Sequence, residues 1–195
     1  KLPEKEEGVT VTKAFTGMKI LAVEDVPINL KITVFLLENM GFEINQNKTH
    51  FIIFILIPLA VGVLSSLFSG NMSYSAFNKP SFSPPSNLFP IVWTVLYILM
   101  GISSYIIYSS NSPNKEKALT TYAIQLFFNF FWSILFFGFS QYLLAFLWLL
   151  VLIILILVMI YQFYQIQPLA AYLQIPYLLW CLFAAYLNYT IYRLN

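Results

Sequence analysis

Polar and aromatic residues recur at helical spacing inside three long apolar stretches, and these are the residues that could bind a ligand. In the stretch at about 118–138, the pattern is Gln125, Asn129, Trp132 and Phe136. A helix places positions with this spacing on one face. Amide side chains are costly in hydrocarbon, so we expect this face to point into a helix bundle rather than toward lipid.

Two other apolar stretches carry matching faces. One is formed by Trp93, Tyr97, Met100 and Ser104, and the other by Tyr177, Trp180 or Cys181, Ala184 and Asn188. Indole and phenol rings stack on flat aromatic ligands, with a gain of about 0.5–1.5 kcal/mol per pair beyond burial. The same residue types also suit helix packing and interhelical hydrogen bonds. Spacing alone therefore leaves a ligand cavity and a packed core as alternatives.

The sequence lacks the residues of common catalytic and metal centres. His50 is the only histidine and lies at the entry to the first apolar stretch, while Cys181 is the only cysteine and Asp25 the only aspartate. We find no acid–base pair, no nucleophilic triad and no metal site in this pattern. Axial histidine ligation of haem iron is not expected inside the apolar region.

Charge divides the chain into two parts. Of its 18 charged residues, 13 lie in the first 51 positions, and the rest are Lys79, Lys115, Glu116, Lys117 and Arg193. So little charge cannot form a water-soluble surface over the remaining 144 positions. The net charge of +2 does not indicate a nucleic-acid partner.

Five apolar runs, at about 51–69, 88–109, 118–138, 141–163 and 170–192, each approach the roughly 20 residues that cross a bilayer core. Residues 147–160 are continuously apolar, unlike the alternating strands of a membrane β-barrel. The predicted fold class is an all-α membrane protein, a bundle of five transmembrane helices with a short N-terminal βα-like segment.

Two runs are candidate surfaces for a homodimer. In the fourth run, residues 147–160 have no polar face apart from Trp148, so we expect this run to be the most lipid-exposed or oligomer-facing span. The first run carries Gly62 and three serines, small residues that allow close helix approach. Positive charges near the span ends lean toward a cytoplasmic N-terminus.

The N-terminal segment has a different character. We expect residues 18–25 to form a buried strand that ends in the acidic pair Glu24 and Asp25. Pro27 suits a helix start, and an apolar stripe at helical spacing follows to Met40, before a second possible strand at 42–44. This resembles the opening β-α unit of a response-regulator receiver domain, but no later aspartate can accept a phosphoryl group. We expect residues 1–47 to be a truncated receiver-like or fusion segment and 48–195 to be the membrane domain, with a membrane-anchored signalling fusion as an alternative.

Four segments of the membrane part carry a family resemblance. They are residues 74–85, with the prolines Pro80, Pro84 and Pro85, residues 90–101, residues 125–133, and residues 175–189. In order and spacing they closely resemble the translocator protein family, also called tryptophan-rich sensory proteins or TspO/MBR, over about residues 51–195. Two positions depart from the family pattern: Phe82 replaces the usual tryptophan of the loop motif, and Ser73 replaces a frequent aromatic residue.

The resemblance implies five helices around a pocket that the first loop caps, in a family whose members bind porphyrins such as protoporphyrin IX and, in animals, cholesterol and synthetic drugs. It implies no obligatory cofactor. With the inward faces described above, it gives a set of expected ligand-binding residues: Tyr74, Trp93, Tyr97, Asn129, Trp132, Tyr177, Trp180, Cys181 and Ala184. Lys79 in the loop is expected either to meet a porphyrin propionate or to be an ordinary lysine at the membrane interface.

The expected function is an integral membrane receptor, sensor or transporter for a tetrapyrrole or another flat apolar molecule, in a bacterial cell membrane. The alternative is a light-dependent porphyrin-degrading enzyme, in which Trp93 and Trp180 would pass a radical to the bound photosensitiser. A sterol-recognition pattern of Leu187, Tyr189 and Arg193 also fits at the C-terminal end. Its alternative interpretation is an anchor at the membrane interface.

Overall fold

The structure is a computed structural model that describes residues 19–20, 43–44, 46–69, 78, 80 and 83–195. It divides into two compact units, Lys1–Ile52 and Ile53–Asn195. In the first unit, β1 (Lys19–Ile20) and β2 (Glu43–Ile44) pair in parallel, with Lys19 opposite Glu43. Both strands fall within segments expected to be extended. Glu24, Asp25 and the helix expected after them lie outside the described residues, so the receiver-like interpretation stays a prediction.

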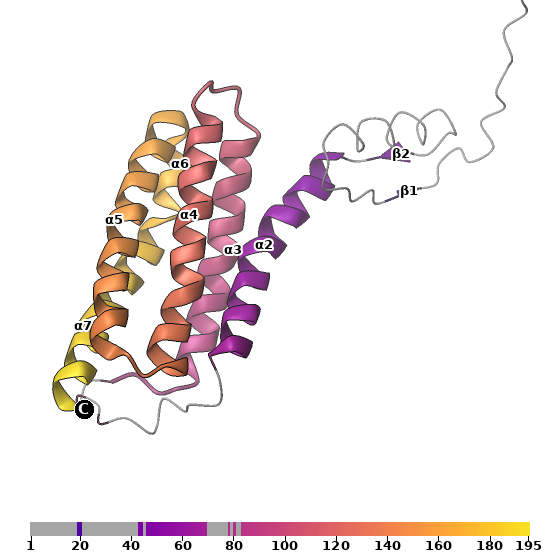
Figure 1. The fold of residues 1–195 in the computed structure, drawn as a ribbon. Helices are drawn as coiled ribbons and strands as arrows, with labels where there is room; N and C mark the ends of the chain where they lie inside the picture. Colours follow the sequence, from indigo (N-terminus) through magenta and orange to yellow (C-terminus); the bar gives the residue numbers. More distant parts are fainter. Residues whose placement is uncertain (1–18, 21–42, 45, 70–77, 79, 81–82) are drawn as a thin grey trace, which may run out of the picture. The chain divides into compact units, whose positions relative to one another are not determined.

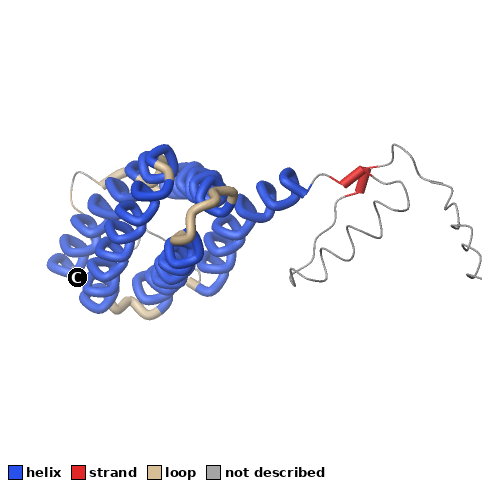
Figure 2. The backbone as a smooth tube through the Cα atoms, turned by 90° about the horizontal axis from the view of Figure 1, so that it is seen from above, coloured by secondary structure: helices blue, strands red, loops and turns tan. Residues whose placement is uncertain are grey.

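The second unit is a bundle of long helices that pack side by side (Figures 1 and 2). Five helical segments within the described residues are long and apolar enough to cross a membrane, which confirms the predicted five-helix bundle. The elements are α2 (Gln46–Phe68), which enters this unit at Ile53, α3 (Leu88–Tyr108), α4 (Lys115–Ser133) with its π-helical continuation η2 (Ile134–Gly138), α5 (Tyr142–Ile166), α6 (Pro168–Tyr172) and α7 (Ile175–Leu194).

The fifth span is two helices rather than the single helix expected over 170–192. The short α6 ends at Tyr172, and α7 begins at Ile175 with Pro176 in its first turn. Proline disfavours helical geometry in the residue before it and lacks the N–H that a continuous helix would need. At the start of a helix this N–H has no partner to lose, so the chain breaks and restarts here.

The expectation that the fourth span is the most exposed is wrong. In the most apolar window of α5, 33% of the residues are buried within the protein, against 11% in α2. Ala145, Leu149, Leu152, Ile156 and Met159 of α5 are buried at helical spacing. An entirely apolar sequence does not reveal which side faces protein, because lipid and a protein interior favour the same residues. Of the five spans, α2 has the smallest share of buried residues.

Two glycines let α2 and α3 approach closely. A Cβ atom added at Gly101 would lie 2.5 Å from the Cα of Ile55 and 2.7 Å from the carbonyl oxygen of Phe54. That carbonyl is the one whose usual helical partner would be the N–H of residue 58, which Pro58 lacks. Two turns further along α2 and one turn away along α3, a Cβ at Gly62 would overlap the ring of Tyr97. Gly62 of the first span therefore serves a contact within the chain, and the homodimer surface expected on this span stays a prediction.

Candidate ligand-binding site

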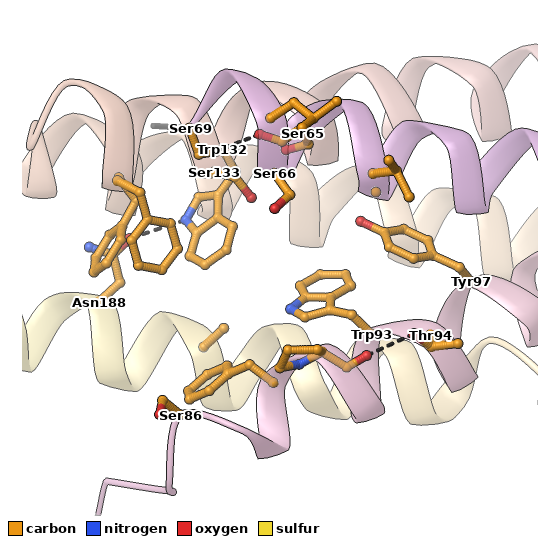
Figure 3. A pocket seen from close by; sticks show the side chains of 18 of the residues that line it. Ser65, Ser66, Ser69, Ser86, Trp93, Thr94, Tyr97, Trp132, Ser133 and Asn188 are labelled. Carbon is orange, nitrogen blue, oxygen red and sulfur yellow. Dashed lines mark hydrogen bonds between the residues drawn. The ribbon is translucent and has the colours of Figure 1, made fainter. Parts of the chain in front are cut away.

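A cavity of about 570 Å³ lies between α2, α3, the α4–η2 segment and α7 (Figure 3). Volumes of roughly 300–1,000 Å³ are typical of small-molecule sites. None of the residues that line the cavity is charged. Its lining consists of Leu59, Gly62, Val63, Ser65, Ser66, Leu67, Ser69, Ser86, Phe89, Pro90, Trp93, Thr94, Tyr97, Trp132, Ser133, Phe136, Phe137, Ala184, Leu187, Asn188 and Ile191.

Two indoles enter the cavity from different helices. Trp93 of α3 stacks on Tyr97 with ring centroids 5.3 Å apart and meets Tyr177 edge-on at 6.2 Å. Figure 3 shows the indole of Trp93 between the walls of the cavity, with that of Trp132 across from it. These rings give the cavity flat apolar surfaces on which a conjugated ligand can stack.

Trp132 is held by a hydrogen bond to α7. Its indole Nε1–H donates to Oδ1 of Asn188 at 3.2 Å, and Nδ2 of Asn188 donates to the carbonyl of Tyr142 at 2.8 Å. Trp132 also stacks on Phe136 at 5.6 Å. Because the amide of Asn188 is engaged at both ends, it fixes the indole against α7 and ties the start of α5 to the same wall.

A buried hydrogen-bonded network stands behind Tyr97. The hydroxyl of Tyr97 donates to Oδ1 of Asn129 at 2.8 Å, Nδ2 of Asn129 donates to the hydroxyl of Tyr177 at 3.0 Å, and Tyr177 donates to Oε1 of Gln125 at 2.9 Å. All four side chains are buried. The amides expected to point into the bundle therefore do so, and they join α3, α4 and α7.

Hydroxyl groups line the side of the cavity formed by α2 and the end of α4. Ser65 donates to the carbonyl of Phe130 at 2.9 Å, and Ser69 donates to the carbonyl of Ser65. Ser66 and Ser133 also line the cavity, and within the described part of the chain their hydroxyl groups have no hydrogen-bond partner. The cavity thus has an aromatic side and a side that can hydrogen-bond to a ligand.

Comparison with known proteins identifies the family of this chain. Residues 54–193 match the TspO/MBR family. The chain belongs to this family. With its five apolar helices, it is a multi-pass integral membrane protein.

Relatives share the family's membrane part over nearly their whole length. Tryptophan-rich protein TspO from Archaeoglobus fulgidus is 39% identical over 144 residues, which are 72% of this chain and 94% of the relative. Translocator protein from Sus scrofa is 39% identical over 148 residues, 73% of this chain and 88% of the relative. Tryptophan-rich sensory protein from Cereibacter sphaeroides is 31% identical over 151 residues, 77% and 94% of the two chains.

The structure of this TspO/MBR family member brings part of the expected ligand-binding set together. Trp93, Tyr97, Trp132 and Ala184 line the cavity. Asn129 and Tyr177 lie one layer behind it, in the network that ends on Tyr97. Tyr74, together with Lys79 and Phe82 of the same loop, lies outside the described residues.

Besides Asn129 and Tyr177, two more expected ligand-binding residues do not line the cavity. Trp180 packs edge-on against Phe89 at 5.7 Å and against Phe183 at 5.6 Å. Cys181 is buried in the helix core. The spacing along α7 could not choose between them, because both positions lie near the inward face. It is Ala184, one turn further along α7, that reaches the cavity.

The residues of the sterol pattern are not gathered into one site. Leu187 is 4% exposed and lines the cavity, whereas Tyr189 is 44% exposed and packs against Phe146 at 5.3 Å. Positions two apart on a helix point in nearly opposite directions. Arg193 lies exposed in the last turn of α7.

Several cavity residues were absent from the expected ligand-binding set. Helical spacing predicts that Phe136 and Asn188 lie on inward faces, and this spacing could have added them to the set. Ser66, Thr94 and Ser133 carried no such signal, since hydroxyl residues in apolar helices commonly bond to their own backbone, as Thr94 does to the carbonyl of Pro90 at 2.8 Å. Among the described residues, no three His, Cys, Asp or Glu side chains are grouped so that they could hold a metal ion.

Proposed function

We propose that this protein binds a tetrapyrrole such as protoporphyrin IX in the cavity, and serves as a membrane receptor, sensor or transporter for it. The observation that carries the proposal is the cavity itself, with two indoles from different helices and no charged side chain in its lining. An uncharged, flat-walled site suits a large conjugated ring, whose apolar faces lose water on entry.

The names of the relatives support both routes of action. One relative is called a translocator protein and another a sensory protein. A bound porphyrin could serve either purpose, because both need selective capture from the membrane or its surface. We therefore propose that binding of the porphyrin in the cavity is the step that transport and sensing have in common.

Binding is favoured over light-dependent degradation. The enzymatic alternative relied on Trp93 together with Trp180. Only Trp93 lines the cavity, and Trp180 packs instead against Phe89 and Phe183. The two indoles therefore do not face one ligand from two sides.

A titration of purified protein with protoporphyrin IX tests this proposal. We expect saturable quenching of tryptophan fluorescence in the wild type and a clear loss of affinity in Trp93→Ala and in Trp132→Ala. Trp148→Ala is the matched control, because Trp148 packs on Phe128 at 4.3 Å outside the cavity lining and should leave affinity unchanged. Non-saturable quenching, or equal loss in all three variants, would contradict the proposal.

We also propose a bacterial cell membrane as the location, with the N-terminal end of α2 in the cytoplasm. Lys115 and Lys117 lie in the first turn of α4 at that end of the bundle, whereas Arg193 lies in the last turn of α7 at the other. In the sequence, Lys48 precedes the first span and Lys79 falls in the loop after it. In a Cys181→Ala background, a membrane-impermeant maleimide added to intact cells should label Gln141→Cys and leave Asn111→Cys unlabelled. The reverse pattern would invert the proposed orientation.

A further inference from the structure

In the buried network of Tyr97, Asn129, Tyr177 and Gln125, all hydrogen bonds are donated in the same direction, from Tyr97 toward Gln125, so that each residue between them accepts on one side and donates on the other. A tyrosine hydroxyl has a single proton, so each hydroxyl in the network can donate only once. Tyr177 spends its proton on Oε1 of Gln125 and therefore accepts from Nδ2 of Asn129. This leaves Oδ1 of Asn129 for Tyr97, which donates to it.

Gln125 stands at the end of this sequence of bonds. Its side chain is fully buried, and its Nε2 has no hydrogen-bond partner among the described residues. If Gln125 presented its nitrogen to Tyr177 instead, every bond would reverse, and Tyr97 would have its proton free for the cavity. The orientation of one amide, two residues removed from the cavity wall, therefore decides which hydrogen-bonding role Tyr97 plays there.

We propose that Gln125 is a positioning residue for the ligand cavity. Through Tyr177 and Asn129, Gln125 keeps the hydroxyl proton of Tyr97 in its hydrogen bond to Asn129. The Tyr97 hydroxyl then presents only lone pairs to the cavity, and it accepts a hydrogen bond from an N–H or O–H group of the ligand. In Figure 3 the Tyr97 ring lies along the cavity, beside the α2 wall. The same bonds hold this ring against Gly62 and under Trp93. This inference deepens the proposed function and rests on it for its affinity measurement.

The first test needs no ligand. Tyrosines labelled with ¹³C at the ring Cζ report the hydrogen bonding of each hydroxyl, and the signal of Tyr97 is the one missing from Tyr97→Phe. We expect this signal to move in Gln125→Leu, although two residues intervene. Gln174→Leu is the matched control, because Gln174 is an equally buried amide outside the network and should leave the signal in place.

Tyr177→Phe interrupts the network while keeping the ring, and it should move the Tyr97 signal even if Gln125→Leu fails to fold. An unmoved Tyr97 signal in either folded variant would overturn the proposal. So would an equal movement in the Gln174→Leu control.

The second test is a double-mutant cycle with protoporphyrin IX as the probe. We expect Gln125→Leu to weaken binding about threefold to tenfold in the wild-type background. In a Tyr97→Phe background it should cause no further loss, because the hydroxyl through which Gln125 acts is already gone. A merely structural role would give the same loss in both backgrounds, and that result would overturn the proposal. If the wild type does not bind the porphyrin saturably, the proposed function fails, and the ¹³C measurement alone decides the role of Gln125.

Discussion

Replacing Gly62 by alanine puts a methyl group where the ring of Tyr97 already lies. The new Cβ would overlap Cε2 of that ring and lie 2.9 Å from Cδ2 and 3.0 Å from Cζ. The ring has little freedom to move aside, because its hydroxyl is bonded to Asn129 and Trp93 stacks on its face. Overpacking of this kind costs about 1–3 kcal/mol.

Alanine also favours the helix over glycine by about 0.8–1.0 kcal/mol, which offsets part of that cost. Gly62→Ala should therefore range from nearly neutral to about 2 kcal/mol less stable than the wild type. Gly138→Ala is the control, because a Cβ there would make only ordinary contacts, at 3.6 Å from Ile134 Cγ2 and the carbonyl of Phe68. We expect Gly62→Ala to be less stable than this control by about 1–3 kcal/mol.

The assay is equilibrium unfolding in mixed detergent micelles, followed by tryptophan fluorescence. The same Gly62→Ala change in a Tyr97→Ala background should lose its penalty, since the ring that it strikes is absent. Equal stability of Gly62→Ala and Gly138→Ala would refute the reasoning. A penalty that persists in full without the Tyr97 ring would refute it as well.

Three further outcomes follow from the same geometry. Gly101→Ala should destabilise the protein more than Gly62→Ala does in the same unfolding assay, because its Cβ meets the backbone of Ile55 at 2.5 Å and a backbone cannot rotate away. An equal or smaller loss of stability would contradict the close contact of α2 and α3. Asn188→Ala should shift tryptophan emission and lower stability by about 1–3 kcal/mol, since two bonds, to Trp132 and to Tyr142, are lost; an unchanged spectrum and stability would argue against the bond to Trp132. Cys181 is 1% exposed, so a maleimide should label it only after denaturation in SDS, and rapid labelling of the folded protein would disagree with its burial.

The number and approximate bounds of the membrane helices could be predicted because lipid imposes a long, continuous apolar requirement on each span. The inward direction of α4 could also be predicted, because amides such as Gln125 and Asn129 have no favourable place in hydrocarbon. Both are buried and hydrogen-bonded within the bundle. Polarity inside an apolar helix is thus the informative signal.

Where that signal was missing, the prediction failed or stopped short. The apolar sequence of α5 gave no sign of its central place, since its buried residues, such as Leu149 and Ile156, are of the same type as its exposed ones. Trp180 was expected at the ligand because of its type and its family position, but its ring packs beside Phe89. Ser66 lines a cavity that lies between α2 and α3. The close approach of these helices at Gly62 and Gly101 depends on the pair of helices and not on either sequence alone.

Filling the cavity is the most direct measurement of the claim that it binds a porphyrin. Ala184 lines the cavity, so Ala184→Phe should place a ring inside it, whereas Ala123→Phe adds the same ring to an exposed position of α4 outside the lining. In equilibrium titrations followed by the Soret absorbance of protoporphyrin IX, we predict saturable binding to the wild type and to Ala123→Phe, and loss of saturable binding in Ala184→Phe. Unchanged affinity in a folded Ala184→Phe protein would contradict the account.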